Sequence, residues 1–124
     1  NTPRPNESLV WTAQQGEVTQ PRTGKVMQPW VPVQGTLSTV DEQDRRRSFA
    51  DWLVQPNNPY FAKMEVNRIW AQLFSRGIVD PIDDFRDSNP PSNVELLDAL
   101  AQDFVKSGFD RKHILRTILN SRTY

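Results

Sequence analysis

The longest pattern of regularly spaced apolar residues lies between Asn58 and Gly77 and predicts a central helix. On a helical wheel its apolar positions form one continuous arc, made of Ala62, Val66, Ile69, Trp70, Leu73 and Phe74 and widened by Tyr60, Met64 and Ala71. Asn58 suits the N-cap, Pro59 suits the first turn, and Gly77 suits a left-handed C′ position. Because the arc is wider than one core-facing stripe, we expect this helix to be covered on more than one side.

Three shorter amphipathic patterns predict three further helices. The first spans about Asp41 to Val54 and buries Phe49, Ala50, Trp52 and Leu53. It begins in the capping-box pattern Thr39–Glu42, in which Asp41 could compete as the cap. The second is capped by Ser92, and its core face is Leu96, Leu97, Leu100, Ala101, Phe104 and Val105. The third follows Gly108, is capped by Asp110, and faces the core with Ile114, Leu115, Ile118 and Leu119. The sequence therefore predicts a mostly α protein, a compact bundle of about four helices.

Residues 1–38 predict an extended, proline-rich arm, because the prolines at 3, 5, 21, 29 and 32 forbid helix across most of this stretch. The arm can form a short hairpin around Gln15-Gly16, and Pro21–Gly24 has a β-turn signature. Trp11 and Trp30 are too large and apolar for a free tail, so we expect the arm to pack on the body; an exposed aromatic platform is the alternative. The expected organisation is one domain, with the arm at 1–38 and a helical body at 39–124.

The composition narrows the classes of function. Lys plus Arg equals Asp plus Glu at 15 each in 124 residues, so no net field attracts nucleic acid or an anionic membrane. The chain contains no cysteine, which excludes a disulfide, a thiolate metal site and a cysteine nucleophile. No apolar run approaches the ~20 residues that span a bilayer. We therefore expect no nucleic-acid partner and no membrane insertion, while the residues alone leave the compartment open.

The segment after Gly77 is acidic and broken by prolines, and its aspartates, Asp80, Asp83, Asp84 and Asp87, raise the question of a calcium site. Counting from Asp84 puts Glu95 at the twelfth position of an EF-hand-like loop, but Arg86 and Asn89 stand where a ligand and the turn glycine are needed. We predict no metal here and expect these carboxylates to cap turns and pair with arginines.

Asn67 falls inside the apolar arc of the central helix, where an amide cannot be left without partners. We expect it to be buried and to bond main-chain groups of the acidic segment or of the arm, while Arg68 pairs with an aspartate of that segment. The candidate binding residues are Asn67, Arg68, Asp83, Asp84, Arg86 and Asp87.

No catalytic residue and no cofactor is predicted. His113 is the only histidine, and it has no nucleophile or ligand set around it in the sequence. The last two helices resemble a helix-turn-helix with Ser107–Phe109 as the turn, which would place Arg111, Lys112, His113 and Arg116 toward DNA. The neutral net charge speaks against that interpretation.

From Arg47 onward, about two-thirds of the chain carries a series of motifs in order: Phe49–Leu53, Asn58–Phe61, Val66–Trp70, Arg76–Arg86, Asn89–Asn93, Leu96–Ala101 and Ser121–Tyr124. By these motifs the chain resembles the planctomycete-associated family of domains of unknown function numbered fifteen-fifty-three. Pro21–Val26 resembles the segment that precedes it in the family, more weakly. Ser75 departs from the pattern, since family members often have glycine there.

The resemblance implies a module of a large exported protein that often carries a cytochrome-c-like domain and another domain of unknown function. It implies an extracytoplasmic location, a chain that is a fragment of a longer protein, and partners among the other domains of that protein. It implies no reaction and no catalytic residues. Our first hypothesis is a non-catalytic interaction or scaffold module. The rival is part of a hydrolytic or redox enzyme with Asp83, Asp84 and Asp87 lining a cleft, and a nucleic-acid binder comes third.

Overall fold

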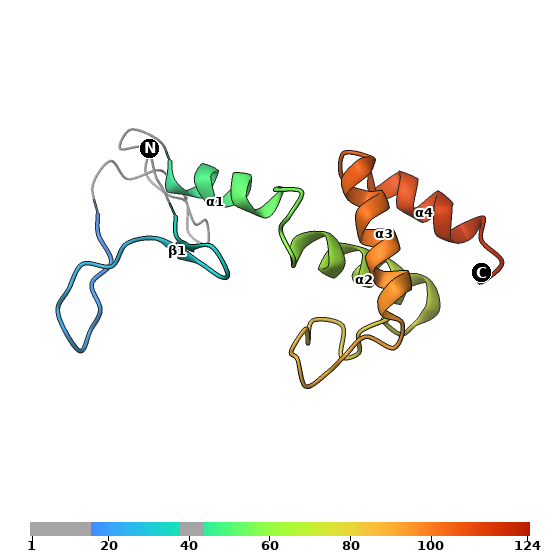
Figure 1. The fold of residues 1–124 in the computed structure, drawn as a ribbon, viewed down its shortest axis with the longest axis horizontal. Coiled ribbons are helices and arrows are strands. Elements are labelled where there is room, and N and C mark those ends of the chain that lie inside the picture. The colour runs from blue at the N-terminus through green and yellow to red at the C-terminus, as the bar shows by residue number, and fades with distance from the viewer. Residues whose placement is uncertain (1–15, 38–43) are drawn as a thin grey trace, which may run out of the picture. The chain divides into compact units, whose positions relative to one another are not determined.

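The computed structural model describes residues 16–37 and 44–124, and the chain divides into two compact units, Asn1–Asp51 and Trp52–Tyr124. The described residues contain the helices α1 (Arg45–Leu53), α2 (Phe61–Phe74), α3 (Val94–Lys106) and α4 (Arg111–Leu119), and one small sheet of β1 (Trp30–Val31) and β2 (Gly35–Thr36) (Figure 1). Of the residues that the structure describes, 44% are helical, which confirms the predicted mostly α class. None of the helices in the described ranges has the length and apolar character needed to cross a bilayer.

The first unit contains two short antiparallel pairings. Thr19 bridges Val26 across a turn in which the Gln20 side-chain oxygen accepts hydrogen bonds from the backbone N–H groups of Arg22 and Thr23. Gly24 has a φ of +66°, a conformation that favours glycine, so the predicted turn at Pro21–Gly24 is present. The partner strand predicted on the other side of Gln15-Gly16 lies outside the described residues.

In the second pairing, Trp30 lies opposite Thr36 and Val31 lies opposite Gly35. Val31 is buried, whereas the side chain of Trp30 is 67% exposed and that of Val33, at the turn, is 81% exposed. The expectation that Trp30 is a buried anchor is therefore wrong, because neighbouring residues of a strand point to opposite faces and Val31 occupies the covered one. Trp11 lies outside the described residues.

Helix α1 begins at Arg45, and the predicted capping box at 39–42 lies outside the described residues. Glu17 contacts the first turn of α1 through an ion pair with Arg45, in which the Glu17 Oε1 and Arg45 Nη2 atoms lie 2.7 Å apart. The hydrogen bond from Arg45 lowers the pKa of the Glu17 carboxyl. Trp52 is buried, but Phe49 is 45% exposed. The predicted apolar face is thus covered only toward the end of the helix, since the arginine-rich first turn is solvated.

The second unit is built on α2. Asn58 accepts hydrogen bonds from the backbone N–H groups of Tyr60 and Phe61, so it caps this helix as predicted, although regular helix begins only at Phe61. At the other end Ser75 takes the left-handed conformation, with a φ of 62°. The prediction that Gly77 fills that position is wrong, because the chain turns two residues earlier.

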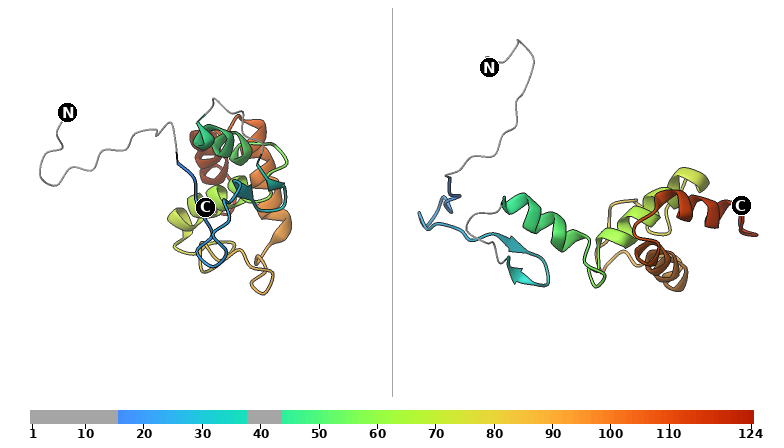
Figure 2. Two further views of the ribbon diagram at one scale, coloured as in Figure 1. Left: turned by 90° about the vertical axis from the view of Figure 1, so that its left-hand side faces the viewer. Right: turned by 90° about the horizontal axis from the view of Figure 1, so that it is seen from above.

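Helices α3 and α4 complete the core, with α3 beside α2 (Figure 1, Figure 2). The shared core consists of Ala62, Val66, Ile69, Ile78, Val79, Leu97, Leu100, Ala101, Phe104, Ile114 and Ile118. Asn93, not the predicted Ser92, caps α3 by accepting from the Leu96 N–H group. Asp110 caps α4 as predicted, and the hydrogen bonds from the backbone N–H groups of His113 and Lys112 lower the pKa of its carboxyl.

Candidate functional site

The acidic loop, defined here as residues 78–91, connects α2 to α3 and begins inside the core. Ile78 and Val79 are buried in the cluster of α2, α3 and α4, and from Asp80 onward the loop emerges into solvent. Its two ends meet, because the backbone N–H and the side-chain hydroxyl of Ser92 both donate to the Ile78 carbonyl, each at 2.8 Å. Most of the residues singled out from the sequence lie on this loop or on the face of α2 that it covers.

Asn67 is fully buried and joins α2 to the acidic loop. Its amide nitrogen donates to the carbonyl oxygens of Val79 and Ile82, and its amide oxygen accepts from the Val79 N–H, all at 2.9 Å. Burial and bonding to the main chain of this loop are both confirmed. Because the amide has two N–H groups, the two donor bonds use its whole donor capacity, and one side chain binds three main-chain groups of the loop, two of them on the buried Val79.

Gly77 lies against the same amide. A Cβ atom at this position would stand 3.0 Å from both the nitrogen and the oxygen of the Asn67 amide and would overlap the carbonyl oxygen of Val79. The glycine is therefore required by close approach and not by backbone conformation. The prediction from the sequence assigned Gly77 to a left-handed cap and so missed this reason. The available signal was a polar side chain inside an apolar arc, followed by a glycine at the helix end.

Arg68, the neighbour of Asn67 on the outer side of α2, adds an ion pair to the loop. Its Nε and Nη2 atoms donate to one oxygen of Asp83, at 3.0 and 2.8 Å. This confirms the predicted pairing with a loop aspartate. Both side chains are more than half exposed, at 52% and 62%, so the pair is a surface ion pair that stabilises the loop little.

The other charged candidates of the loop pair among themselves or stand alone. Arg86 donates from Nη2 to Asp84, at 2.7 Å, and its side-chain hydrogen bonds lower the pKa of the Asp84 carboxyl. Asp80 makes a looser pair with Arg76, at 3.4 Å. The Asp87 carboxylate has no partner among the described residues. The structure thus brings Asn67, Arg68 and Asp83 together, pairs Asp84 with Arg86, and leaves Asp87 apart.

The loop has no arrangement suited to a cation. Within residues 16–37 and 44–124, no group of three or more histidine, cysteine or acidic side chains converges on a point. Asn89, at the place of the EF-hand glycine, donates instead to the carbonyl oxygens of Asp80 and Asp84. The pairing of loop carboxylates with arginines agrees with the prediction from the sequence.

Two of the four residues considered for DNA contact bind side chains of other helices, Arg111 through an ion pair and His113 through a hydrogen bond. Arg111 pairs with Glu65 on α2 at 2.7 Å, and the His113 Nε2 atom lies 2.7 Å from Asp103 on α3. Lys112 and Arg116 are exposed. Arg111 and His113 therefore fasten α4 to the rest of the helical unit.

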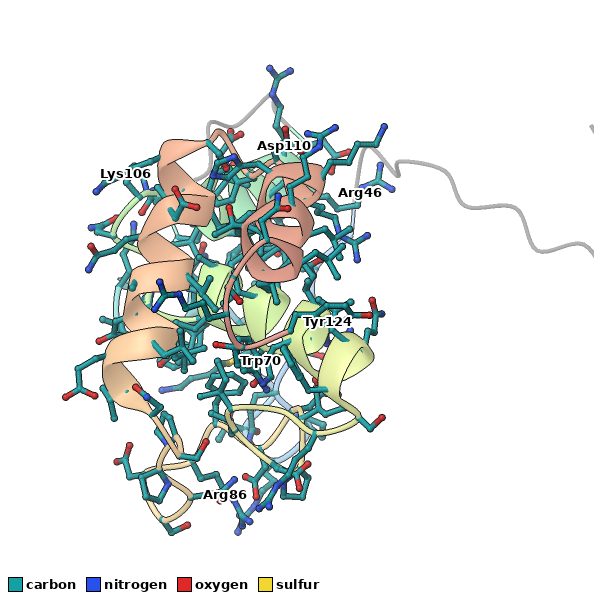
Figure 3. The ribbon with its side chains drawn as sticks, turned by 90° about the vertical axis from the view of Figure 1, so that its right-hand side faces the viewer. Arg46, Trp70, Arg86, Lys106, Asp110 and Tyr124 are labelled. Atoms are coloured by element: carbon teal, nitrogen blue, oxygen red, sulfur yellow. The ribbon has the colours of Figure 1, made fainter. Side chains whose placement is uncertain are left out.

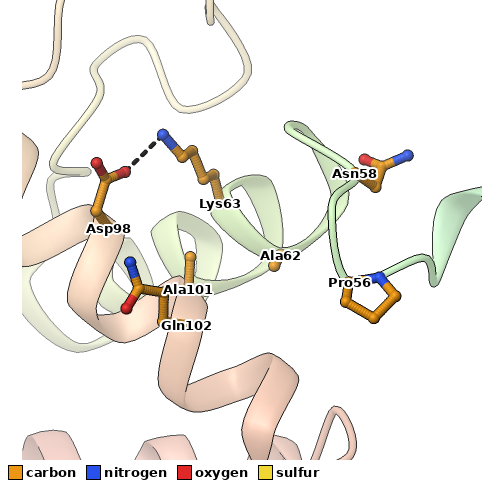
Figure 4. A pocket seen from close by; sticks show the side chains of 7 residues that line it. All are labelled: Pro56, Asn58, Ala62, Lys63, Asp98, Ala101 and Gln102. Carbon is orange, nitrogen blue, oxygen red and sulfur yellow. Dashed lines mark ion pairs between the residues drawn. The ribbon is translucent and has the colours of Figure 1, made fainter. Parts of the chain in front are cut away.

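A shallow hollow of about 220 Å³ lies between the start of α2 and the middle of α3 (Figure 4). Its lining consists of Pro56, Asn58, Ala62, Lys63, Asp98, Ala101 and Gln102. Lys63 and Asp98 point toward one another as an ion pair, and the Oδ1 atom of Asp98 is shielded from solvent with the Lys63 ammonium as its counter-charge. The ion pair therefore lies in the lining of a small polar notch.

Three aromatic rings form a partly exposed cluster at the other end of α2. The ring centroids of Trp70 and Phe74 are 4.3 Å apart, and those of Phe74 and Tyr124 are 5.8 Å apart. Tyr124 is 66% exposed. Figure 3 labels Trp70 and Tyr124, the two outer members of this cluster, and shows Arg86 on the loop at the opposite end of α3 from Lys106.

Residues 45–124 match the model of a family described as PSD1, protein of unknown function (DUF1553). The chain belongs to this family. The DUF1553 match contains all four helices and the whole acidic loop, and it begins after the hairpin of β1 and β2. No curated protein and no solved structure matches the chain.

Proposed function

We propose that the helical unit is a non-catalytic interaction or scaffold module of a larger polypeptide. The observation that carries this proposal is the state of Asn67. This polar residue of the core is fully buried, with both amide N–H groups bound to the loop. A side chain engaged in this way holds a turn in place and has no donor left for a substrate.

The charges of the acidic loop support the same proposal. A carboxyl that acts as a general acid near neutral pH needs a raised pKa. The pKa of Asp84 is lowered instead, through its hydrogen bonds with Arg86, and Asp83 is bound by Arg68. The lowered pKa of the Asp84 carboxyl, and the pairing of both aspartates with arginines, suit a structural element better than a general acid.

The setting of the module is part of the proposal and rests on the resemblance of its motifs. We place it in a large exported planctomycete protein of the kind that often carries a cytochrome-c-like domain. Its partners would then be the other domains of that protein, in an extracytoplasmic compartment. Such a module provides a binding surface and positions the other domains of the assembly, and those domains carry out the chemistry.

Binding in trans tests the proposal. This chain and the remaining part of its parent polypeptide would be purified separately, and their association measured by isothermal titration calorimetry. Saturable one-to-one binding is expected, and it should persist in the Asp83→Asn and Asp84→Asn variants, which keep the side-chain shape and lose the charge. Absence of binding would contradict the proposal.

The enzyme alternative makes the opposite prediction for the same variants. The parent polypeptide and its Asp83→Asn and Asp84→Asn forms would be assayed with chromogenic ester and glycoside substrates. A scaffold predicts that any turnover is unchanged by either substitution. Loss of turnover at unchanged melting temperature would establish a catalytic role for the acidic loop.

A further inference from the structure

We draw no further inference here: the strongest candidate, the partly exposed aromatic cluster of Trp70 and Phe74 on α2 with Tyr124 after α4, is an unpartnered apolar face, and nothing in the described part of the chain shows what covers it.

Discussion

Replacement of Gly77 by alanine is the sharpest test of the loop attachment, because general experience and the structure predict opposite signs. Gly77 does not have a positive φ. At such positions a change from glycine to alanine ordinarily stabilises a protein by about 0.4–1 kcal/mol, since it restricts the unfolded chain. The structure predicts a clear loss of stability instead, because the added methyl group would overlap the Val79 carbonyl and press on the Asn67 amide.

The size of the loss follows from which atoms must move. The Val79 carbonyl is backbone in the core and cannot rotate away, so the loop has to shift relative to α2. Forcing volume into a packed interior costs about 1–3 kcal/mol. The shift also strains the three hydrogen bonds of Asn67, and each buried group left unpaired costs about 1–3 kcal/mol. With partial relaxation, we expect the free energy of unfolding to fall by about 2–4 kcal/mol.

Urea unfolding, followed by circular dichroism and tryptophan fluorescence, measures this free energy. Gly108→Ala is the contrasting case, because Gly108 has a φ of +70° and no atom within 4 Å of an added Cβ, whereas Gly77 has the close contacts without the positive φ. That variant isolates the backbone penalty of the left-handed region, about 1–2 kcal/mol. A Gly77→Ala variant as stable as the parent, or more stable, would refute the close-approach explanation.

A double-mutant cycle then identifies the partner. In the Asn67→Ala background the amide that crowds the new methyl group is gone, so Gly77→Ala should cost less than it does in the parent. The contact with Val79 remains, so part of the cost should persist. Strict additivity of the two substitutions would show that Gly77 and Asn67 do not interact.

Substitutions at three positions test a buried amide, an exposed ion pair and a helix cap. Asn67→Ala should lower the free energy of unfolding by about 1–3 kcal/mol, read from urea midpoints, because it strands main-chain groups of the loop; an unchanged midpoint would contradict the structural role of this amide. Arg68→Ala should change that free energy by less than about 1 kcal/mol in the same assay, as its pair with Asp83 is exposed, and a larger loss would mean that the ion pair holds the loop. Asp110→Ala should lower the melting temperature, and Asp110→Asn should restore most of it, since both Asp and Asn cap helices. In the folded protein the pKa of Asp110 is lowered from its ordinary value of 3.8. The negative charge therefore stabilises the folded state at pH values above 3.8, and this contribution is lost as the pH falls through the lower pKa of the folded state. An acid titration followed by circular dichroism should therefore show a smaller loss below pH 3.8 for Asp110→Asn than for the parent, and identical titrations would argue against a charged cap.

The sequence predicted that Asn67 attaches α2 to a neighbouring segment, but it did not predict which segment this is or how α2 ends. An amide inside an apolar arc had to be buried with main-chain partners, and Asn67 is. The choice between the loop and the arm stayed open, because one sequence does not say which segment passes over a helix face. The end of α2 was misjudged, since the preference for glycine at a left-handed C′ position competes with a packing requirement visible only in three dimensions.

The contacts between helices could not be predicted at all. The pairs of Lys63 with Asp98, Glu65 with Arg111, and Asp103 with His113 depend on packing angles that hydrophobic periodicity does not encode. The prediction from the sequence also overestimated the burial of large side chains, because size and apolarity describe an average preference for the protein interior and do not fix the position of a given side chain. Trp30 and Phe49 are exposed at 67% and 45%, although both are aromatic.

Because the two ends of the acidic loop meet at the Ile78 carbonyl, the residues between those ends can accept an insertion. Ser92 closes the loop at its base, so the helices on either side keep their positions whatever length of chain lies between. Lengthening a closed loop costs little, about 0.6 kcal/mol for each doubling. Asp87 and Ser88, between the two ends of the loop, are exposed. A peptide tag or a reporter sequence inserted between them should leave α2 and α3 intact, which offers a route to label this protein without disturbing its helical core.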